Sequence, residues 1–400
     1  MPDVEAASHS HFRAWMVLAG LSLGVCVSNG FARFAYGLIL PAMRSDLGWT
    51  YTQAGWINTS NALGYLAGAA LTFALVRKFP AYRLFAWGMI GTSASLLLSG
   101  AAPAFWMLTV LRITAGIFGA LVFISGGALA TRLFAEDRAR SALAIAIYFG
   151  GGGLGMMLSG ATIPVLFAQA GTAAWPWAWF ALGLASFACC LWSIWASRVM
   201  ATTAATEAGS GVPNGRLPTA RMLPELSGYC LFGTGYIVYI TFLVAWMNSF
   251  HAGTAVISAV WVTIGIGIAL SPFIWRPILA RFDGGAPLAL ASSTCALAIL
   301  VGVVVPSVGG LLASALLFGL AVFIGPASVT AFSRKNLDAN AVGPAIALFT
   351  FVFAAGQVVG PVTAGVIGDS TGSIRDGLTA AAAIMLAGAA LAAVQRPLER

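Results

Sequence analysis

Long apolar stretches, separated by short charged or Pro/Gly-rich breaks, follow one another along the whole 400-residue chain. A helix needs about 20 predominantly apolar residues to cross a bilayer. The stretches therefore predict an all-α membrane protein with twelve transmembrane helices, near residues 14–42, 51–76, 82–102, 104–132, 140–168, 174–197, 225–249, 254–279, 286–305, 308–332, 342–367 and 376–394.

A polar interruption separates the sixth predicted helix from the seventh. Residues 197–223 are rich in Ala, Thr, Gly and Pro and contain three arginines, a composition typical of a flexible connection. We predict a cytoplasmic linker here, between an N-terminal six-helix half, 1–196, and a C-terminal six-helix half, 224–400.

The two predicted halves resemble each other in sequence. Gly119-Ala-Leu-Val-Phe-Ile-Ser-Gly-Gly in the fourth predicted helix matches Gly319-Leu-Ala-Val-Phe-Ile-Gly-Pro-Ala in the tenth. Parallel repeats with a substrate site near the bilayer midplane between them are an architecture of secondary transporters. The repeat thus predicts two pseudo-symmetric halves around a central site.

The composition and charge of the chain agree with a membrane protein. Hydrophobic residues make up 60% and charged residues 8%, whereas about 25% of a soluble globular domain is charged. If the N-terminus is cytoplasmic, sixteen of the 20 lysines and arginines fall on the cytoplasmic side, two (Arg44 and Arg375) outside, and two within helices. This asymmetry predicts that both termini are cytoplasmic in the inner (plasma) membrane. The net charge of +8 therefore reflects topology, and we expect no nucleic-acid partner.

The residue types that carry metal or enzyme chemistry are sparse. The five cysteines lie in apolar segments without metal-type spacing, so we expect neither a metal nor a cofactor. An intramembrane enzyme would need a cluster of His, Asp or Glu, or a nucleophile pair, at depth. No ATP-binding motif is visible either. The sequence therefore predicts a non-enzymatic secondary transporter, whose partners are a small-molecule substrate and the lipid bilayer.

Two arginines, Arg33 and Arg112, fall inside predicted helices. A charged side chain at membrane depth costs at least about 2.5–3.5 kcal/mol, so such residues usually face a protein interior or a water-filled cavity. Asn29, Arg33 and Tyr36 are spaced i, i+4 and i+7, which predicts that they share one face of the first helix.

Other polar residues are predicted at similar depth. Asn58, Asn61 and Tyr65 share one face of the second helix by spacing, and Phe349, Phe353 and Gln357 share one face of the eleventh. The predicted substrate-binding residues are Asn29, Arg33, Tyr36, Asn58, Asn61, Arg112, Tyr236, Tyr239 and Gln357.

The acidic residues are placed differently from the arginines. None of the twelve acids falls in the interior of a predicted helix, so no buried carboxylate is expected beside Arg33 and Arg112. Because guanidinium groups pair well with carboxylates, we predict a site for a small organic anion. Proton coupling would then use the substrate's own acid group, Glu225 or Asp46 at the cavity rims, or nothing at all.

Several alternatives stay open at this point. Arg112 has a structural interpretation, as a tie from the fourth helix to backbone carbonyls or to Asn29, and Arg33 has one as a side chain that snorkels outward. Tyr236 and Tyr239 fit packing or gating as well as binding. The alternative functions are a proton-coupled drug or metabolite exporter and, more remotely, a non-transporting membrane sensor.

Three segments carry a resemblance to a known family. Asn29-Gly-Phe-Ala-Arg-Phe-Ala-Tyr, followed by Leu40-Pro-Ala-Met-Arg-Ser-Asp-Leu-Gly and Gln53-Ala-Gly, resembles the first helix and outer loop of the YbfB/YjiJ-type branch of the major facilitator superfamily (MFS). Arg112-Ile-Thr-Ala-Gly116 is similar to the family's Arg-x-x-x-Gly motif, whose arginine is implicated in coupling. The run 150–160 resembles the glycine-rich fifth helix of antiporter members. The resemblance implies two six-helix halves that rock around a central site.

The cytoplasmic signature of the family is altered in this chain. Ala74-Leu-Val-Arg-Lys-Phe-Pro-Ala-Tyr-Arg keeps the basic residues of Asp-Arg-x-Gly-Arg but lacks its aspartate and glycine. The corresponding place in the second half, 276–285, holds Arg281 and Asp283 in altered order. The usual latch between conformations is therefore not carried over. Because the core is self-contained, a monomer is the default expectation.

Overall fold

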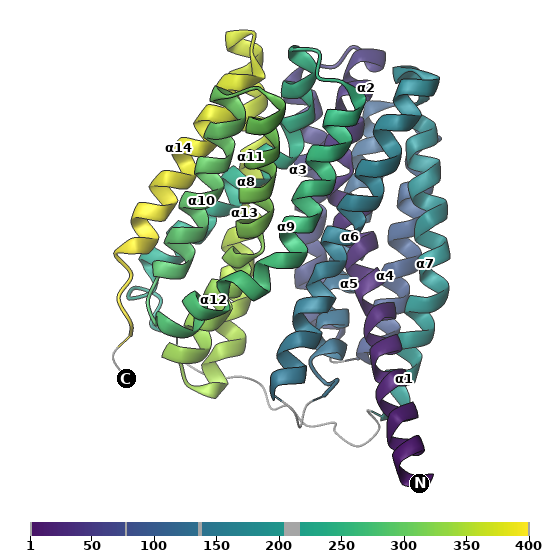
Figure 1. The fold of residues 1–400 in the computed structure, drawn as a ribbon, viewed down its shortest axis with the longest axis vertical. Coiled ribbons are helices and arrows are strands. Elements are labelled where there is room, and N and C mark those ends of the chain that lie inside the picture. The colour runs from purple at the N-terminus through teal and green to yellow at the C-terminus, as the bar shows by residue number, and fades with distance from the viewer. Residues whose placement is uncertain (1, 77, 135–137, 204–216, 399–400) are drawn as a thin grey trace.

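Twelve long helical runs lie side by side in the molecule (Figure 1). The structure is a computed structural model and describes residues 2–76, 78–134, 138–203 and 217–398. Ten of the runs within these residues are long and apolar enough to cross a membrane. The other two, α3 and α4, pack against α5. The predicted all-α class with twelve helices in two halves is confirmed.

The first half begins with one continuous run, made of α1, a π-helical segment η1 and α2. Five further helices and a short 3₁₀ turn, η2, complete this half. The bounds are α1 Pro2–Val25, η1 Cys26–Phe34, α2 Tyr36–Leu47, α3 Tyr51–Leu75, α4 Ala81–Ser99, α5 Phe105–Ala130, α6 Arg138–Ala170, η2 Thr172–Ala174 and α7 Trp175–Thr203.

The second half repeats this arrangement, with its fourth run divided into α11 and α12. Its bounds are α8 Leu223–Ser249, α9 Thr254–Arg281, α10 Ala286–Val304, α11 Val308–Val322, α12 Ile324–Asn336, α13 Ala339–Thr371 and α14 Ile374–Ala393. The two ends of the chain lie at the same end of the bundle (Figure 1). We call this end the termini end and the opposite end the far end.

The predicted boundary between the halves differs from the observed helix ends. Helix α7 continues to Thr203, past the predicted linker start at 197, because this stretch of Ser, Arg, Val, Met and Ala forms helix readily. Residues 204–216, the central part of the predicted linker, lie outside the described residues, as do three members of the predicted cytoplasmic basic set, Arg77, Arg216 and Arg400. The domain limits therefore stay predictions.

The π-helical segment η1 lies in the middle of the first run and is buried throughout. Such wide turns are rare and concentrate at functional sites. The glycine at position 30 lets η1 approach α6 closely, because a Cβ there would lie 2.5 Å from the Cα of Gly155. The glycine-rich segment of α6 therefore packs closely against η1.

The two halves contact each other along α3 and α13, α6 and α9, and α2 and α8. At the far end, Asp369 of α13 accepts hydrogen bonds from the backbone N–H groups of Tyr51 and Thr52 at 2.8 and 2.9 Å, and from the Thr52 hydroxyl at 2.6 Å. A carboxylate is favourable at the N-terminus of a helix such as α3. This contact holds the halves together at the far end.

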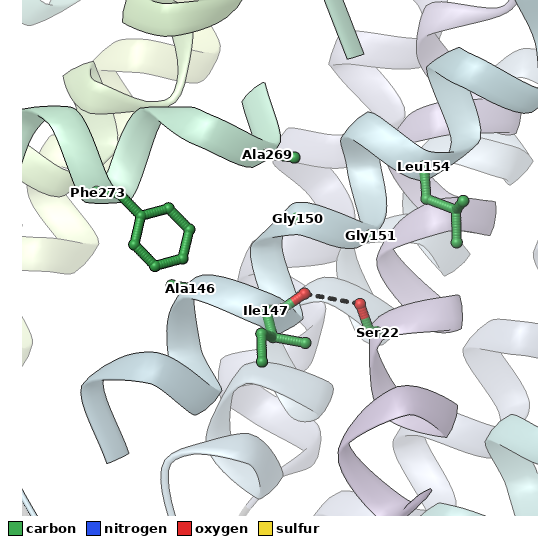
Figure 2. A pocket seen from close by; sticks show the side chains of 8 residues that line it. All are labelled: Ser22, Ala146, Ile147, Gly150, Gly151, Leu154, Ala269 and Phe273. Carbon is green, nitrogen blue, oxygen red and sulfur yellow. Dashed lines mark hydrogen bonds between the residues drawn. The ribbon is translucent and has the colours of Figure 1, made fainter. Parts of the chain in front are cut away.

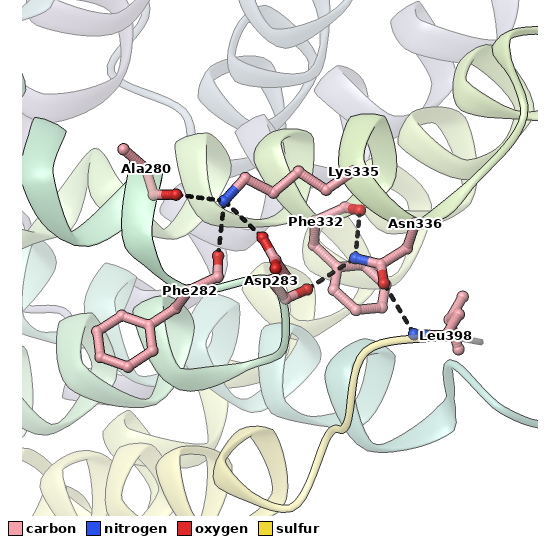
Figure 3. A network of polar contacts seen from close by, with 7 residues as sticks. All are labelled: Ala280, Phe282, Asp283, Phe332, Lys335, Asn336 and Leu398. Carbon is pink, nitrogen blue, oxygen red and sulfur yellow. Dashed lines mark hydrogen bonds and ion pairs between the residues drawn. The ribbon is translucent and has the colours of Figure 1, made fainter. Parts of the chain in front are cut away.

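A polar network ties the C-terminal segment to the second half at the termini end (Figure 3). Asp283, between α9 and α10, pairs with Lys335 of α12 at 2.9 Å. Asn336 donates to the Asp283 carbonyl at 2.7 Å and accepts from the Leu398 N–H at 2.8 Å. Asp283 of the altered signature, 276–285, therefore pairs with Lys335, which lies outside that signature.

Candidate functional site

Arg33, in the last turn of η1, lies at the boundary between the two halves. Its side chain is only 5% exposed, so it does not snorkel outward. Its guanidinium carbon lies 5.1 Å from the ring centre of Tyr65 in α3, and the next residue, Phe34, meets Phe323 of the second half with 6.3 Å between ring centres. Nη2 donates to no residue that the structure describes. Arg33 is thus a buried cation with unused hydrogen-bonding capacity.

Arg112, in α5, has its described contacts inside the first half. Its side chain is fully buried, and Nη2 donates to the carbonyl of Ala32 in η1. The guanidinium carbon lies 5.1 Å from the ring of Trp179 and 5.6 Å from that of Tyr36. The structure thus confirms the predicted contact of Arg112 with a backbone carbonyl. Nε and Nη1 have no hydrogen-bond partner among the described residues.

The three predicted asparagines differ in the hydrogen bonds that the structure describes for them. Asn61 donates to the Arg112 carbonyl at 3.1 Å, which keeps it within the first half. Asn58 donates to the hydroxyl of Thr241 in α8, across the boundary between the halves. Asn29 is buried, and its Oδ1 has no partner among the described residues. Asn58 therefore joins the halves, and Asn29 lies on η1 with Arg33.

Tyr36 has other described partners than Arg33. Its hydroxyl donates to the Ala54 carbonyl at 2.8 Å, and its ring stacks on Trp179 with 6.4 Å between ring centres. The i, i+4, i+7 spacing assumes an α-helix, but the residues before Tyr36 form the π-helical η1. The wide turn directs Arg33 to the boundary between the halves and Tyr36 into the first half.

Tyr239 lies inside the second half. Its hydroxyl is 2.6 Å from the hydroxyl oxygen of Ser314, and its ring centre is 4.3 Å from that of Phe318. Both partners belong to α11. The structure therefore does not bring Tyr239 together with Arg33, and its packing interpretation fits these contacts.

Tyr236 and Gln357 are the predicted residues on the buried faces of α8 and α13. The ring of Tyr236 stacks on Phe353 of α13, 5.4 Å between centres and 7° from parallel. Gln357 lies one helical turn after Phe353 and is fully buried, yet neither its Oε1 nor its Nε2 has a partner among the described residues. Gln357 thus places an unsatisfied polar side chain on the buried face of α13.

The structure corrects one expectation about acids. Glu225, predicted at a cavity rim, is buried with 1% exposure in the first turn of α8, and its Oε2 has no described partner. Its backbone N–H donates to Gln395 at 3.3 Å, so it lies beneath the C-terminal segment. Asp46 accepts from the Trp175 indole at 2.8 Å at the far end. Among described contacts of Arg33 and Arg112, none is with a carboxylate.

A cavity of about 250 Å³ opens between α1, α6 and α9 (Figure 2). The hydroxyl of Ser22, its one polar lining side chain, donates to the Ile147 carbonyl at 2.8 Å. The cavity contains none of the predicted site residues, and its walls are the apolar Ala146, Leu154, Ala269 and Phe273 with Gly150 and Gly151. The candidate site around Arg33 is therefore separate from this cavity.

Sequence analysis left three residues out of the predicted substrate-binding set. Tyr65 stacks against Arg33, and its position one turn after Asn61 was a usable signal. Trp179 and Thr241 had no local signal, because their roles depend on α5 and α3, which are distant in sequence.

Comparison with known proteins agrees with this architecture. The model of the family described as "Uncharacterised MFS-type transporter YbfB" matches residues 25–393. A Haemophilus influenzae protein named as a metabolite transport protein is 31% identical over 145 residues, 36% of this chain and 35% of that protein. A Streptomyces lividans chloramphenicol resistance protein is 25% identical over 254 residues, 62% of this chain and 61% of that protein. The matched part is thus less than two thirds of each relative.

A plant relative and two solved structures extend the comparison. An Oryza sativa protein named as chloroplastic anion transporter 3, with the qualifier "probable", is 27% identical over 158 residues, 38% of this chain and 29% of that protein. The nucleoside transporter NupG superposes with a TM-score of 0.68 at 14% identity, over 94% of this chain and 97% of NupG. A bacterial homologue of the human lysosomal transporter Spinster, inward-facing and unoccupied, gives 0.66 at 14% identity, over 96% and 95%. At such identity the structures share the fold alone, and that fold is a transporter fold.

Proposed function

Since the chain belongs to the YbfB-type family of major facilitator superfamily transporters, we propose that it carries a small organic anion, such as a carboxylate, by alternating access. The observation that carries this proposal is Arg33, a buried cation at the boundary between the halves with a hydrogen-bond donor left over. A bound carboxylate would supply the missing acceptor and neutralise the charge.

Other buried polar groups support the same ligand. Nε2 of the Gln357 amide has no described acceptor, and Tyr236 stacks on Phe353, one helical turn before Gln357. Because Arg112 has its described contacts within the first half, we assign it to positioning: it holds the η1 carbonyl next to Arg33. The binding set of this proposal is therefore Arg33, Asn29, Tyr236 and Gln357.

The proposal also includes the membrane location, the topology and the energy source of the transporter. In this proposal the chain is a monomer of the inner membrane with both termini in the cytoplasm, and the excess of basic residues on the cytoplasmic side supports this topology. Ion gradients or exchange would drive net uphill transport. Proton coupling would fall to the substrate's own carboxyl group or to Glu225, since Asp46 is engaged by Trp175 at the far end.

The test is uptake of radiolabelled small carboxylates into liposomes that hold the purified full-length protein. We expect uptake by the wild type, loss of most uptake in Arg33→Gln, and unchanged uptake in Arg375→Gln, an exposed arginine at the far end. Equal uptake by Arg33→Gln and the wild type would refute the role of Arg33. Binding of carboxylates without uptake would instead favour a membrane sensor.

A drug or metabolite exporter is the second candidate, and the names of the relatives favour it. The Streptomyces lividans relative is a chloramphenicol resistance protein and covers the larger share of this chain. Buried arginines repel lipophilic cations, so this candidate would have to take neutral or anionic compounds. Proton-driven efflux of neutral compounds from the same liposomes, with no carboxylate uptake, would favour the exporter.

A further inference from the structure

Aromatic side chains cluster on the second-half side of Arg33. We call Tyr229, Phe232, Tyr236 and Phe353 the second-half aromatic cluster. The ring centre of Phe353 lies 4.6 Å from that of Tyr229 and 5.4 Å from that of Tyr236, with the rings 10° and 7° from parallel. Phe232 adds a third ring of α8, 6.2 Å from Phe353. The near-parallel rings of α8 and α13 therefore stack on one another and form one apolar block.

A second set of rings lies on the first-half side. Tyr65 of α3 is 6.2 Å from Phe123 of α5, and Phe123 is 5.2 Å from Phe149 of α6. Phe123 and Phe149 are half-buried, as is Phe353. These three phenylalanine rings therefore keep part of their surface uncovered by protein.

The two sets face each other around Arg33. Contacts between α3 and α13 run from Thr52 with Asp369 to Thr59 with Val358, and this antiparallel register places Tyr65 opposite the stretch of α13 that contains Phe353. The guanidinium carbon of Arg33 lies 5.1 Å from the ring centre of Tyr65. In contrast to Tyr36 and Tyr239, whose hydroxyls are hydrogen-bonded, Tyr236 forms no described hydrogen bond through its hydroxyl. A single cation is thus flanked by aromatic rings from both halves.

This arrangement matches one class of anion, and the inference rests on the proposed function. We infer that the substrate is an aromatic carboxylate, whose carboxylate binds Arg33 and whose ring lies against Tyr65 and Phe353. Aromatic pairs in stacked or edge-to-face contact gain affinity beyond the apolar area that they bury. A saturated ring of the same size would bury a similar area without this gain.

The test compares acids that differ only in ring type. Purified full-length protein in detergent is titrated with benzoate, phenylacetate and 3-phenylpropionate, each beside its cyclohexyl counterpart, and binding is read from the rise in unfolding temperature. We expect the best aromatic acid to bind roughly 2- to 10-fold more tightly than its counterpart. Equal affinity would overturn the aromatic inference and leave the anion proposal standing. If no acid binds, including acetate and succinate, the proposed function itself fails.

Two neighbouring phenylalanines of α13 provide a matched pair of variants. Phe353→Leu removes a ring from the second-half aromatic cluster, whereas Phe351→Leu changes a side chain that is 57% exposed on the outside of the same helix. We expect the aromatic preference to vanish in Phe353→Leu and to persist in Phe351→Leu. Full preference in both variants would refute the role of Phe353. If Phe353→Leu does not fold, the ligand comparison on the wild type still decides.

Discussion

The surroundings of the two buried arginines differ. Because of this difference, we assign Arg112 to structural support and Arg33 to substrate binding. Arg112 is enclosed by the first half, where it holds the Ala32 carbonyl and lies near the rings of Tyr36 and Trp179. Arg33 lies between the halves. Its described contact with an aromatic ring of its own half is with Tyr65. A cation with partners in one rigid half stabilises that half in every state of the transport cycle. A cation between the halves can exchange its partners when the halves move.

Removing Arg112 is the most direct test of the difference between the two arginines. We expect Arg112→Ala to lower the free energy of unfolding by about 2–4 kcal/mol, because the buried volume, the hydrogen bond to Ala32 and the cation–π contacts are all lost. Thermal unfolding in detergent measures the effect, with Arg375→Ala as the exposed control. An unchanged unfolding temperature together with lost carboxylate binding would place Arg112 in the binding site instead.

Removing Arg33 is expected to lower the affinity for carboxylates more than the stability of the protein. Charge-assisted hydrogen bonds contribute about 1.5–3 kcal/mol, so carboxylate affinity falls roughly 10- to 100-fold in Arg33→Ala. The unfolding temperature of the ligand-free protein changes less than in Arg112→Ala, since Nη2 of Arg33 has no described partner to lose. Titration calorimetry and thermal unfolding on the same samples measure both quantities. A large loss of stability with unchanged affinity would refute the distinction between the arginines.

We expect the contact of Asp369 with α3 to stabilise states in which the halves are closed at the far end. Asp369→Asn weakens a helix cap worth about 0.5–2 kcal/mol, so we expect a roughly 2- to 30-fold shift toward states open at the far end. A cysteine introduced by Ala54→Cys, at a buried position one turn into α3, reports opening through its rate of alkylation.

Asp376→Asn, which changes an exposed acid of α14, is the control for this experiment. The alkylation rate should stay at the starting level in that background. Equal rates in the Asp369→Asn and Asp376→Asn backgrounds would mean that the contact of Asp369 with α3 does not hold the far end closed.

The smallest expected effect comes from two tyrosines of α8. Tyr239→Phe loses the hydrogen bond to Ser314 and about 0.5–1.5 kcal/mol of stability. Tyr236→Phe should leave stability unchanged, since its hydroxyl has no described partner, and should change the KM for the carboxylate instead. Thermal unfolding and liposome uptake of both variants test this. Equal losses of stability in the two variants would place Tyr236 in the structural class with Tyr239.

Local rules predicted much of this molecule. Segments such as 254–279 and 376–394 were located from their length of apolar residues alone, and the observed helices Thr254–Arg281 and Ile374–Ala393 agree closely. Burial of Arg33 and Arg112 also followed, because a charge in an apolar helix of a membrane protein turns to the interior. The end of α7 was missed, since helix propensity continued past the last strongly apolar residue.

The partners of the polar residues could not be predicted from spacing. Asn58 and Asn61 share a helix face by periodicity, yet one bonds to Thr241 of the second half and the other to the Arg112 carbonyl. Such partners come from helices far away in sequence, and a small rotation of α3 decides which neighbour each side chain meets.

The sequence by itself determined the membrane class, the twelve helices and the presence of two buried cations, because hydrophobic length and charge are properties of each segment alone. The tertiary structure decided which cation is enclosed and which lies between the halves. The π-helical turn at Cys26–Phe34 is the physical reason: it directs Arg33 to the boundary and Tyr36 toward Arg112, and α6, with its glycine-rich surface, packs against it. No spacing rule for an α-helix contains that turn.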